Sequence, residues 1–262
     1  RNFPLAEKII REWGTSLVIK KDGLHGGKGV DVASTFERTL RAAEEGVRNE
    51  PILIEEKLSG PECSLFYLCD GMNTVYFGSA CDYKTLHAGK DAPMTGGMGA
   101  DAPGHIVDDA LIAYGSILAS AIMAEMRELG SFFKGFLYIS FMLVEKDGQV
   151  LPYVIEFNVR FGDPEAQVIW LLIESGVDVP AYLLASTKTG GLKDMPPIRF
   201  KPKKAVGFVL AEYGYPHQGK RVKTIAALGD TYAEAREKAL LRIKEEDPRS
   251  TLYFRTDIAA GL

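Results

Sequence analysis

The order of apolar and polar residues predicts alternating helices and strands along the whole chain. Capping residues and apolar side chains spaced at helical intervals predict four helices. These helices run from the capping box Ser34-Thr35-Phe36-Glu37 to Arg48, from Asp108 to Leu129, from Asp163-Pro164 to Glu174, and from Thr231 to Glu246.

Apolar runs bounded by turn residues predict the strands. They cover residues 17–20, 52–56, 135–144, 150–158, 204–211, 222–227 and 252–255. The turn Lys146-Asp147-Gly148 joins two of them. Proline and glycine cluster over residues 190–197, which indicates a linker before a small C-terminal α+β unit.

The end of the strand over residues 150–158 carries the first candidate chemistry. Glu156 and Asn158 are two residues apart, so a strand places both side chains on one face. One carboxylate and one amide oxygen, completed by nucleotide phosphates, form a usual set of Mg²⁺ ligands. The same alternation puts Arg160 on that face, where its planar fork could meet phosphate oxygens. The alternative is a strand whose polar face is simply solvated.

A second candidate site lies upstream, between Leu17 and Val30. An apolar strand ends at Lys20 and enters a loop that contains four glycines and Lys28. Glycines let backbone N–H groups approach phosphates closely, and lysine adds a point charge. The spacing is neither that of a Walker A loop nor that of a Rossmann fingerprint. The alternative is a turn with solvated lysines.

A third segment runs from Ile52 to Ser64. A strand ends in paired acids and is followed by a short turn and another strand. Backbone groups of Glu55 and Leu58 could meet an adenine edge, and Glu62 could accept from ribose hydroxyls. The alternative is an ordinary hairpin with a charged tip.

Taken in this order, the segments resemble the glycinamide ribonucleotide synthetase family of the ATP-grasp superfamily. Residues 160–167 resemble the family signature, and residues 18–30 resemble its glycine-rich loop. Asp82-Tyr83-Lys84 and Thr95-Gly96-Gly97-Met98-Gly99 resemble two further family motifs. Ala92 and Met94 depart from the family, which usually has glycine and asparagine there.

The resemblance implies an α+β (α/β) ATP-grasp fold in which two α+β lobes clasp ATP, followed by a small C-terminal α+β domain. The small lobe would cover residues 1–57, the large lobe 58–189 and the C-terminal domain 198–262. The family's separate N-terminal domain has no counterpart in this sequence, and the region after Pro216 is shorter than in the family.

The resemblance also implies roles for single residues. Asp163 has an alternative role as a helix N-cap, Asp82 and Lys84 as a salt-bridged turn, and residues 95–99 as a mobile surface loop. The implied roles are catalysis for Arg160 and Asp163, ATP binding for Lys20, Lys28, Glu55, Leu58 and Glu62, substrate binding for Asp82, Lys84, Thr95, Gly96, Gly97, Met98 and Gly99, and metal binding for Glu156 and Asn158.

The activity that follows from the resemblance is an ATP-dependent carbon–nitrogen ligation in purine biosynthesis. Glycine and 5-phosphoribosylamine would give glycinamide ribonucleotide, ADP and phosphate through a glycyl phosphate, with Mg²⁺ or Mn²⁺. Two alternatives stay open. One is another ATP-grasp carboxylate–amine ligase, and the other is a nucleotide-binding fragment that is inactive by itself.

Composition narrows the class of protein. The chain of 262 residues is 46% hydrophobic and 25% charged, as globular proteins are, and its net charge of −4 does not favour nucleic acid as a partner. The apolar run 136–144 is too short to span a bilayer. The three cysteines have no metal-ligand spacing and predict reduced, mostly buried thiols. We expect a cytoplasmic monomer or homodimer.

Overall fold

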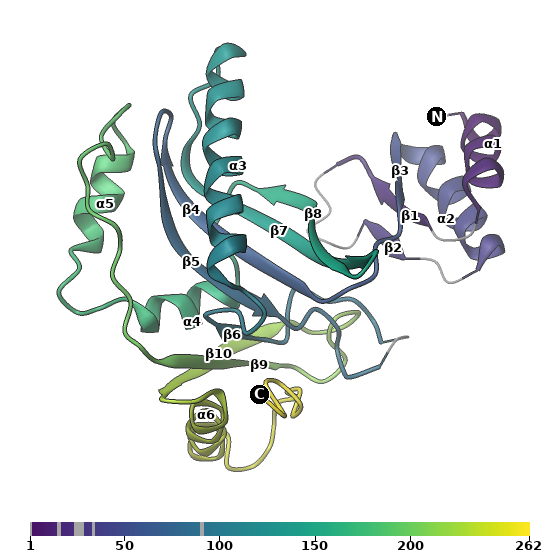
Figure 1. The fold of residues 1–262 in the computed structure, drawn as a ribbon. Helices are drawn as coiled ribbons and strands as arrows, with labels where there is room; N and C mark the ends of the chain where they lie inside the picture. Colours follow the sequence, from purple (N-terminus) through teal and green to yellow (C-terminus); the bar gives the residue numbers. More distant parts are fainter. Residues whose placement is uncertain (1, 15–16, 24–28, 33–34, 90–91) are drawn as a thin grey trace. The chain divides into compact units, whose positions relative to one another are not determined.

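The computed structural model describes residues 2–14, 17–23, 29–32, 35–89 and 92–262. They form two compact units, of which the first comprises Arg1–Ser59 with Met94–Gly96 and the second Gly60–Pro93 with Gly97–Leu262. Figure 1 shows the elements of both units. We describe each unit by itself and call them the N-terminal unit and the sheet unit.

The N-terminal unit is a small antiparallel sheet with two helices packed on it. Its strand order is β2-β1-β3. Alternation along β1 buries Leu17 and Ile19, which join apolar side chains of both helices in one core. The elements are α1 (Phe3–Trp13), β1 (Leu17–Lys21), β2 (Val30–Val32), α2 (Phe36–Asn49) and β3 (Ile52–Glu56).

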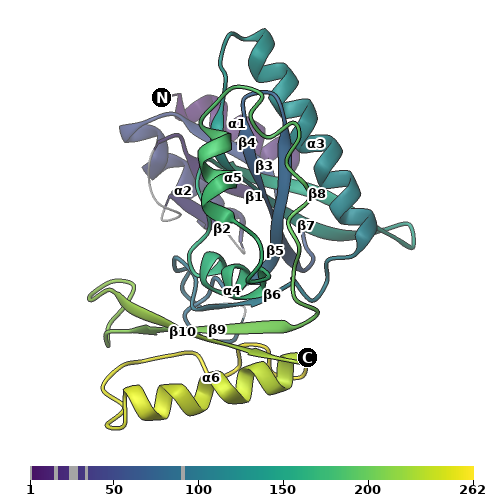
Figure 2. The same ribbon diagram turned by 90° about the vertical axis from the view of Figure 1, so that its left-hand side faces the viewer.

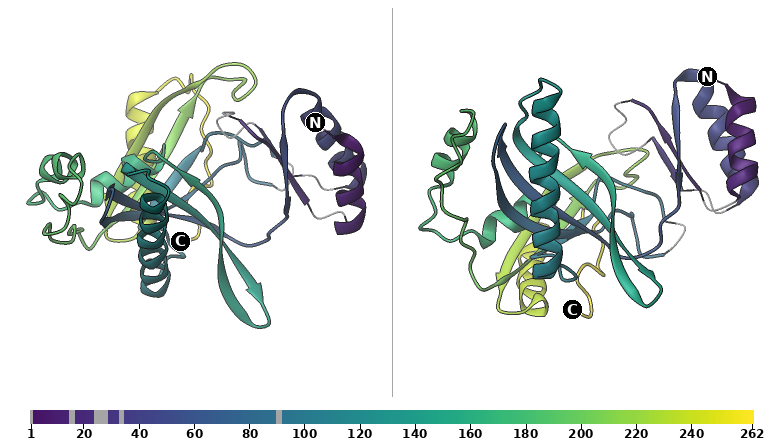
Figure 3. Two further views of the ribbon diagram at one scale, coloured as in Figure 1. Left: turned by 90° about the horizontal axis from the view of Figure 1, so that it is seen from above. Right: turned by 45° about the horizontal axis from the view of Figure 1, so that its top comes forward.

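The sheet unit is built on seven strands in the order β10-β9-β6-β5-β4-β7-β8, and each neighbouring pair is antiparallel. Figure 3 shows the long β7–β8 hairpin extending past the rest of this sheet. The strands are β4 (Glu62–Asp70), β5 (Thr74–Asp82), β6 (Gly99–Ala102), β7 (Lys134–Lys146), β8 (Gln149–Asn158), β9 (Lys204–Ala211) and β10 (Arg221–Gly229).

Helices cover both faces of this sheet, and strand β4 is therefore buried on both sides. Its residues Cys63, Leu65, Tyr67 and Cys69 share a core with α3, whereas Phe66 and Leu68 belong to the core under α4 and α5. The helix α6 packs on β9 and β10 (Figure 2). The helices are α3 (Asp109–Glu128), α4 (Glu165–Leu172), α5 (Val179–Ser186) and α6 (Tyr232–Glu246).

Most predicted elements are present, with bounds that differ by a few residues. The helix α6 begins after its N-cap Thr231, as expected. The helix α3 begins one residue after the predicted start, because Asp108 is its N-cap. The strands β7 and β8 are longer than predicted, since their cross-strand pairing runs to Lys146 and Gln149 at the turn. The helices α1 and α5 were not predicted.

Two predicted helix starts were wrong. The N-cap of α2 is Thr35, whose side chain accepts a hydrogen bond from the Arg38 amide at 3.2 Å. The N-cap therefore lies one residue later than predicted, and Arg38 at the N3 position cannot complete a capping box. The helix α4 begins at Glu165 after Pro164 and has no side-chain cap. Asp163 is therefore not the N-cap.

One predicted strand was also wrong, and one alternative is excluded. Residues 252–255 form only a single bridge, between Tyr253 and Ala211, because the chain leaves the sheet on either side of it. The hairpin considered for residues 52–64 does not exist, since β3 and β4 belong to different sheets. Residues 198–262 share their sheet with residues 60–189, and the three-domain division stays a prediction.

The helix α3 is long and apolar enough to cross a membrane by length and composition alone, a test that the core helix of a soluble protein also passes. Leu111, Ala119 and Met123 on its inner side pack against the sheet. Only 22% of the apolar window of α3 is buried, so most of this helix is not covered by the described residues.

Candidate active site

The predicted metal ligands lie side by side at the end of β8, the edge strand that Figure 1 shows next to β7. Glu156 is paired with Ser140, and Asn158 with Tyr138. The Asn158 side-chain amide donates to Glu156 Oε1 at 3.0 Å, which brings the two groups together as the alternation predicted. A carboxylate and an amide oxygen, both accessible to solvent, fit a hard divalent cation that is completed by phosphate oxygens.

Strand β8 ends at Asn158, so the alternation that placed Arg160 on the same face does not reach it. Arg160 lies in the bend that follows and donates to the Phe161 carbonyl at 3.2 Å. The bend is anchored by Phe161, whose ring stacks on Phe136 with 4.6 Å between centroids. The Phe161 side chain thus fixes the charged turn to the hydrophobic core.

The next polar cluster joins Glu62, at the start of β4, to Lys84 and Ser140. Ser140 Oγ donates to Glu62 Oε1 at 2.8 Å, and the Lys84 ammonium forms an ion pair with the same oxygen. Both charged side chains are about three-quarters buried, with exposed fractions of 25% and 22%. Glu62 and Lys84, predicted for ATP and for substrate, therefore lie in one cluster.

Asp82 and Glu165 form a second group of carboxyls. Burial raises the pKa of Asp82 well above its ordinary value; repulsion from Glu165 adds to the shift, while Arg221 and Arg160 oppose it. Burial also raises the pKa of Glu165, against hydrogen bonds from its own amide and from Tyr138. Asp82 Oδ1 is buried and receives no hydrogen bond from the residues described. The negative charge of Glu165 thus makes ionisation of Asp82 still less favourable.

Two glycines make room for these carboxyls. Gly97 has a φ of +104°, and a Cβ there would lie 2.6 Å from Pro164 Cδ and 2.9 Å from Asp82 Oδ1. A Cβ on Gly162 would lie 2.5 Å from the Glu165 carboxyl carbon. Any larger residue at either position would displace an acid of the site.

Arg221 ties the charged turn to the loop before β6. Its Nη2 donates to Asp163 Oδ2 at 3.0 Å, and its Nη1 donates to the Asp163 carbonyl at 2.8 Å and to the Gly97 carbonyl at 3.4 Å. Gln167 donates to Asp163 Oδ1 at 2.8 Å. Asp163 thus holds the turn in place through both of its carboxylate oxygens.

The predicted loop of residues 95–99 divides between the two units. Thr95 and Gly96 cluster with the N-terminal unit, and Gly97, Met98 and Gly99 with the sheet unit. Met98 is buried, and its amide donates to the Tyr83 carbonyl at 2.9 Å. The Met98 N–H is therefore already hydrogen-bonded within the fold, and substrate binding by residues 95–99 stays a prediction.

In the N-terminal unit, Lys20 forms an ion pair with Glu55 across the β1–β3 pair at 2.6 Å. Two predicted ATP-binding residues are thus neighbours. Leu58 follows β3 and is half-buried. Lys28 lies outside the described residues. ATP binding by this set stays a prediction.

Sequence reasoning missed Glu165, Arg221, Tyr138 and Ser140 as members of the site. Glu165 lies inside the charged turn that the sequence singled out, so its position was a usable signal. Tyr138 and Ser140 alternate along β7 opposite Asn158 and Glu156, which only the register reveals. Arg221 is 58 residues from its partner Asp163, and no local pattern links them.

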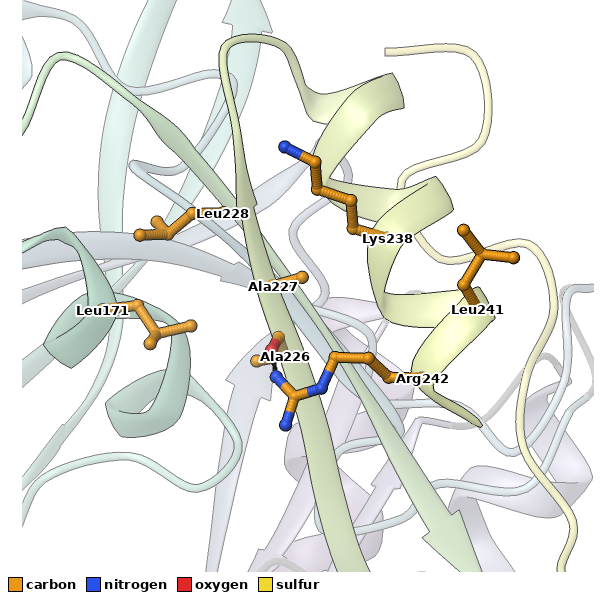
Figure 4. Close-up of a pocket in the computed structure, with 7 residues that line it drawn as sticks. All are labelled: Leu171, Ala226, Ala227, Leu228, Lys238, Leu241 and Arg242. Carbon is orange, nitrogen blue, oxygen red and sulfur yellow. Dashed lines mark hydrogen bonds between the residues drawn. The ribbon is translucent and has the colours of Figure 1, made fainter. Parts of the chain in front are cut away.

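The described residues also form two cavities elsewhere. One, of about 400 Å³, lies between α4, β10 and α6, where Arg242 donates to the Ala226 carbonyl at 2.7 Å (Figure 4). Another, of about 480 Å³, lies beside the β4–β5 turn and the segment 192–198. Neither is lined by a predicted site residue.

Cys81, Asp101 and His105 lie close enough together to hold a metal ion. The Asp101 carboxylate already accepts from the His105 amide at 3.0 Å and lies 3.0 Å from its ring nitrogen Nδ1. Those contacts give the Asp101 carboxylate a structural role, in which it stabilises the loop that follows β6.

Comparison with known proteins decides the family. The profile of the phosphoribosylglycinamide synthetase ATP-grasp (A) domain matches residues 1–166, which hold all the predicted site residues. The chain belongs to this family. Membership in the phosphoribosylglycinamide synthetase family confirms the ATP-grasp fold, and implies use of ATP with a divalent metal.

Similar proteins of known name are phosphoribosylamine–glycine ligases. The phosphoribosylamine–glycine ligase of Brucella melitensis is 36% identical over 234 residues, which are 87% of this chain and 53% of that protein. The ligase of Vigna unguiculata is 37% identical over 238 residues, 87% of this chain and 74% of that protein. The chain spans about half to three-quarters of the length of these relatives.

Solved structures agree with this assignment. The phosphoribosylamine–glycine ligase of Thermotoga maritima superposes with a TM-score of 0.82 at 28% identity, over 98% of this chain and 72% of that one. The biotin carboxylase domain of the Hydrogenobacter thermophilus 2-oxoglutarate carboxylase has a TM-score of 0.63 at 16% identity, over 97% and 61%. The second likeness concerns the fold alone.

Proposed function

We propose that this chain carries the ATP-dependent ligation of glycine to 5-phosphoribosylamine, which gives glycinamide ribonucleotide, ADP and phosphate in purine biosynthesis. The observation that carries the proposal is the grouping, at the ends of β4, β5 and β8, of a hard-ligand pair with buried acids and cations. This grouping lies inside the sequence that matches the family.

The reaction has two steps. A glycine carboxylate oxygen attacks the γ-phosphorus of ATP and ADP leaves, which forms glycyl phosphate. The amine nitrogen of 5-phosphoribosylamine then attacks the carbonyl carbon, the C–O bond to phosphate breaks, and the nitrogen loses a proton. Such chemistry depends mainly on positioning and on charge neutralisation.

The residues of the chain have distinct roles in this proposal. Glu156 and Asn158 would hold Mg²⁺ or Mn²⁺, which neutralises phosphate charge when bound. Lys84 and Arg160 would stabilise anionic groups of the substrates, and Asp163 would keep the turn in place through Arg221. Asp82 or Glu165 would accept the proton, because a buried carboxyl with a raised pKa is a stronger base than an exposed one.

Lys20, Lys28, Glu55, Leu58 and Glu62 would bind ATP. Thr95 to Gly99 would contact the substrates. We further propose a cytoplasmic monomer or homodimer that has no nucleic acid or membrane as partner.

The test is ADP release with ATP and Mg²⁺, with and without glycine and freshly generated 5-phosphoribosylamine. Release that needs both substrates supports the ligase. ATP binding with no release would contradict the proposed activity and identify a nucleotide-binding fragment. Release driven by a different amine would identify another carboxylate–amine ligase.

A further inference from the structure

The segment 252–260 near the C-terminus lies against the loop that follows β5. Arg255 is 9% exposed, and its Nη1 donates to the Thr85 carbonyl at 3.0 Å and to Thr85 Oγ1 at 2.8 Å. Its guanidinium carbon lies 5.3 Å from the ring centroid of Tyr83. One arginine thus contacts the residues on both sides of Lys84.

The orientation of that guanidinium is set by Asp257. Nε and Nη2 of Arg255 donate to the two oxygens of Asp257 at 2.8 and 2.7 Å. These hydrogen bonds outweigh the effect of burial and hold the pKa of Asp257 below its ordinary value. A bidentate pair fixes the plane of the fork, and lysine cannot reproduce this geometry.

Two other hydrogen bonds attach the same segment to the same loop. Tyr253 Oη donates to the Leu86 carbonyl at 2.8 Å, and the Ala259 amide donates to Tyr83 Oη at 3.0 Å. Residues 83, 85 and 86 are therefore each held from a part of the chain about 170 residues away. Lys84, between them, directs its ammonium to Glu62.

We propose that Arg255 is a positioning residue that acts through Lys84. It fixes the backbone from Tyr83 to Leu86, so that the Lys84 ammonium meets the anionic group of the phosphorylated sugar amine with little reorganisation. The inference rests on the proposed function, in which Lys84 binds substrate. A lysine on a flexible four-carbon stem needs such support, because small displacements of a catalytic site are costly.

A double-mutant cycle tests the coupling. Arg255→Gln, Lys84→Met and the double variant are compared, with Arg249→Gln, an exposed arginine just before the segment, as the matched control. We expect Arg255→Gln to lower kcat/KM for 5-phosphoribosylamine about 10- to 100-fold, mainly through KM, with the KM for ATP unchanged. In the Lys84→Met background the same substitution should have no further effect. Additive losses would overturn the inference.

Two further measurements separate positioning from loss of folding. Arg255→Lys keeps the charge, and we expect it not to restore kcat/KM; full restoration would contradict a role for the fork. Hydrogen exchange over residues 83–86 should be faster in Arg255→Gln and in the milder Asp257→Asn, with exchange in α6 unchanged. Unchanged exchange in the loop would also overturn the inference.

The same experiments distinguish the two hypotheses. A parent protein without ADP release that depends on glycine and 5-phosphoribosylamine contradicts the proposed function, whatever Arg255 does. Faster exchange in the loop would then show only that Arg255 holds residues 83–86 in place. Normal turnover with additive losses contradicts only the role of Arg255.

Discussion

Glu156 and Asn158 stand on a strand that is paired with β7 up to its last residue, so backbone hydrogen bonds set their separation. The other acids of the candidate site, Asp82 and Glu165, differ from Glu156 in burial. Asp82 and Glu165 are withdrawn from water and titrate above their ordinary values, whereas Glu156 is exposed. The candidate site thus combines an exposed carboxylate, predicted to bind metal, with buried carboxyls whose pKa values burial raises.

Removing the Glu156 carboxylate should abolish turnover and leave the fold intact. We expect Glu156→Ala to lower kcat at least about 100-fold, because an exposed ligand contributes charge and not packing. The midpoint of thermal unfolding should stay near that of the parent. The matched control is Glu145→Ala, an exposed acid on the neighbouring strand, which should retain activity. A Glu156 variant with near-normal turnover would contradict the metal assignment.

Glu165 should determine the acid side of the pH profile. Its raised pKa means that its basic form is lost as pH falls through a value above the ordinary one, so kcat/KM should decline there. We expect Glu165→Gln to lower kcat/KM about 100-fold and to remove that decline. Glu174→Gln, which changes an exposed acid paired with Arg199, should leave the profile unchanged. An identical acid limb in the Glu165 variant would exclude it as the base.

At the element scale, hairpins and capped helices explain most of the fold. Asp108 and Thr231 each accept a hydrogen bond from a backbone amide in the first helical turn. The sequence predicted the cap at Thr231, and it predicted Asp108 as the start of its helix. Local patterns predicted β9 to the residue but failed at Asp163, whose side chain is taken by Arg221 and Gln167 instead of a cap. Local patterns also do not show to which sheet a strand belongs, and for this reason β3 and β4 were considered as a possible hairpin.

The cap of α6 gives a measurable prediction. Thr231 Oγ1 accepts from the Glu234 amide at 3.1 Å, and Glu234 accepts from the Asp230 amide at 2.7 Å. Thr231→Ala should lower the free energy of unfolding by about 1 kcal/mol in urea denaturation. Ser120→Ala, in the middle of α3, removes no cap and should change it by less than about 0.5 kcal/mol. Equal effects would contradict the cap.

At the scale of the whole molecule, contacts between distant segments hold the sheet unit together. The buried Asp70 accepts from the amides of Met72 and Asn73 in its own turn and from the Leu192 amide at 2.7 Å. Arg255 and Arg221 make comparable long links. None of these links has a local signature, so the sequence could propose site residues but not the contacts that bring them together.

Asp70 should make stability depend on pH. Burial alone would raise its pKa, but these hydrogen bonds hold it below the ordinary value. Its contribution is therefore present above about pH 4, the unfolded value, and is lost as pH falls through the lower folded value. Asp70→Asn should cost about 1–3 kcal/mol at pH 7, and the difference should shrink in acid. Asp147→Asn at the exposed β7–β8 turn should show neither effect.

The burial of β4 on both faces has a consequence for the chemistry of sulfur in this protein. Cys63 and Cys69 point from β4 into the core under α3, and Cys81 is buried at the end of β5. Burial raises the pKa of Cys63 and of Cys69 to about 12, so almost no thiolate exists at pH 8. A colorimetric thiol reagent should find none of the three in the native protein and all three in guanidinium. The native cysteines should therefore not react with maleimides in the folded protein. A single cysteine introduced on the surface could then be labelled with a fluorophore without replacing the three native cysteines.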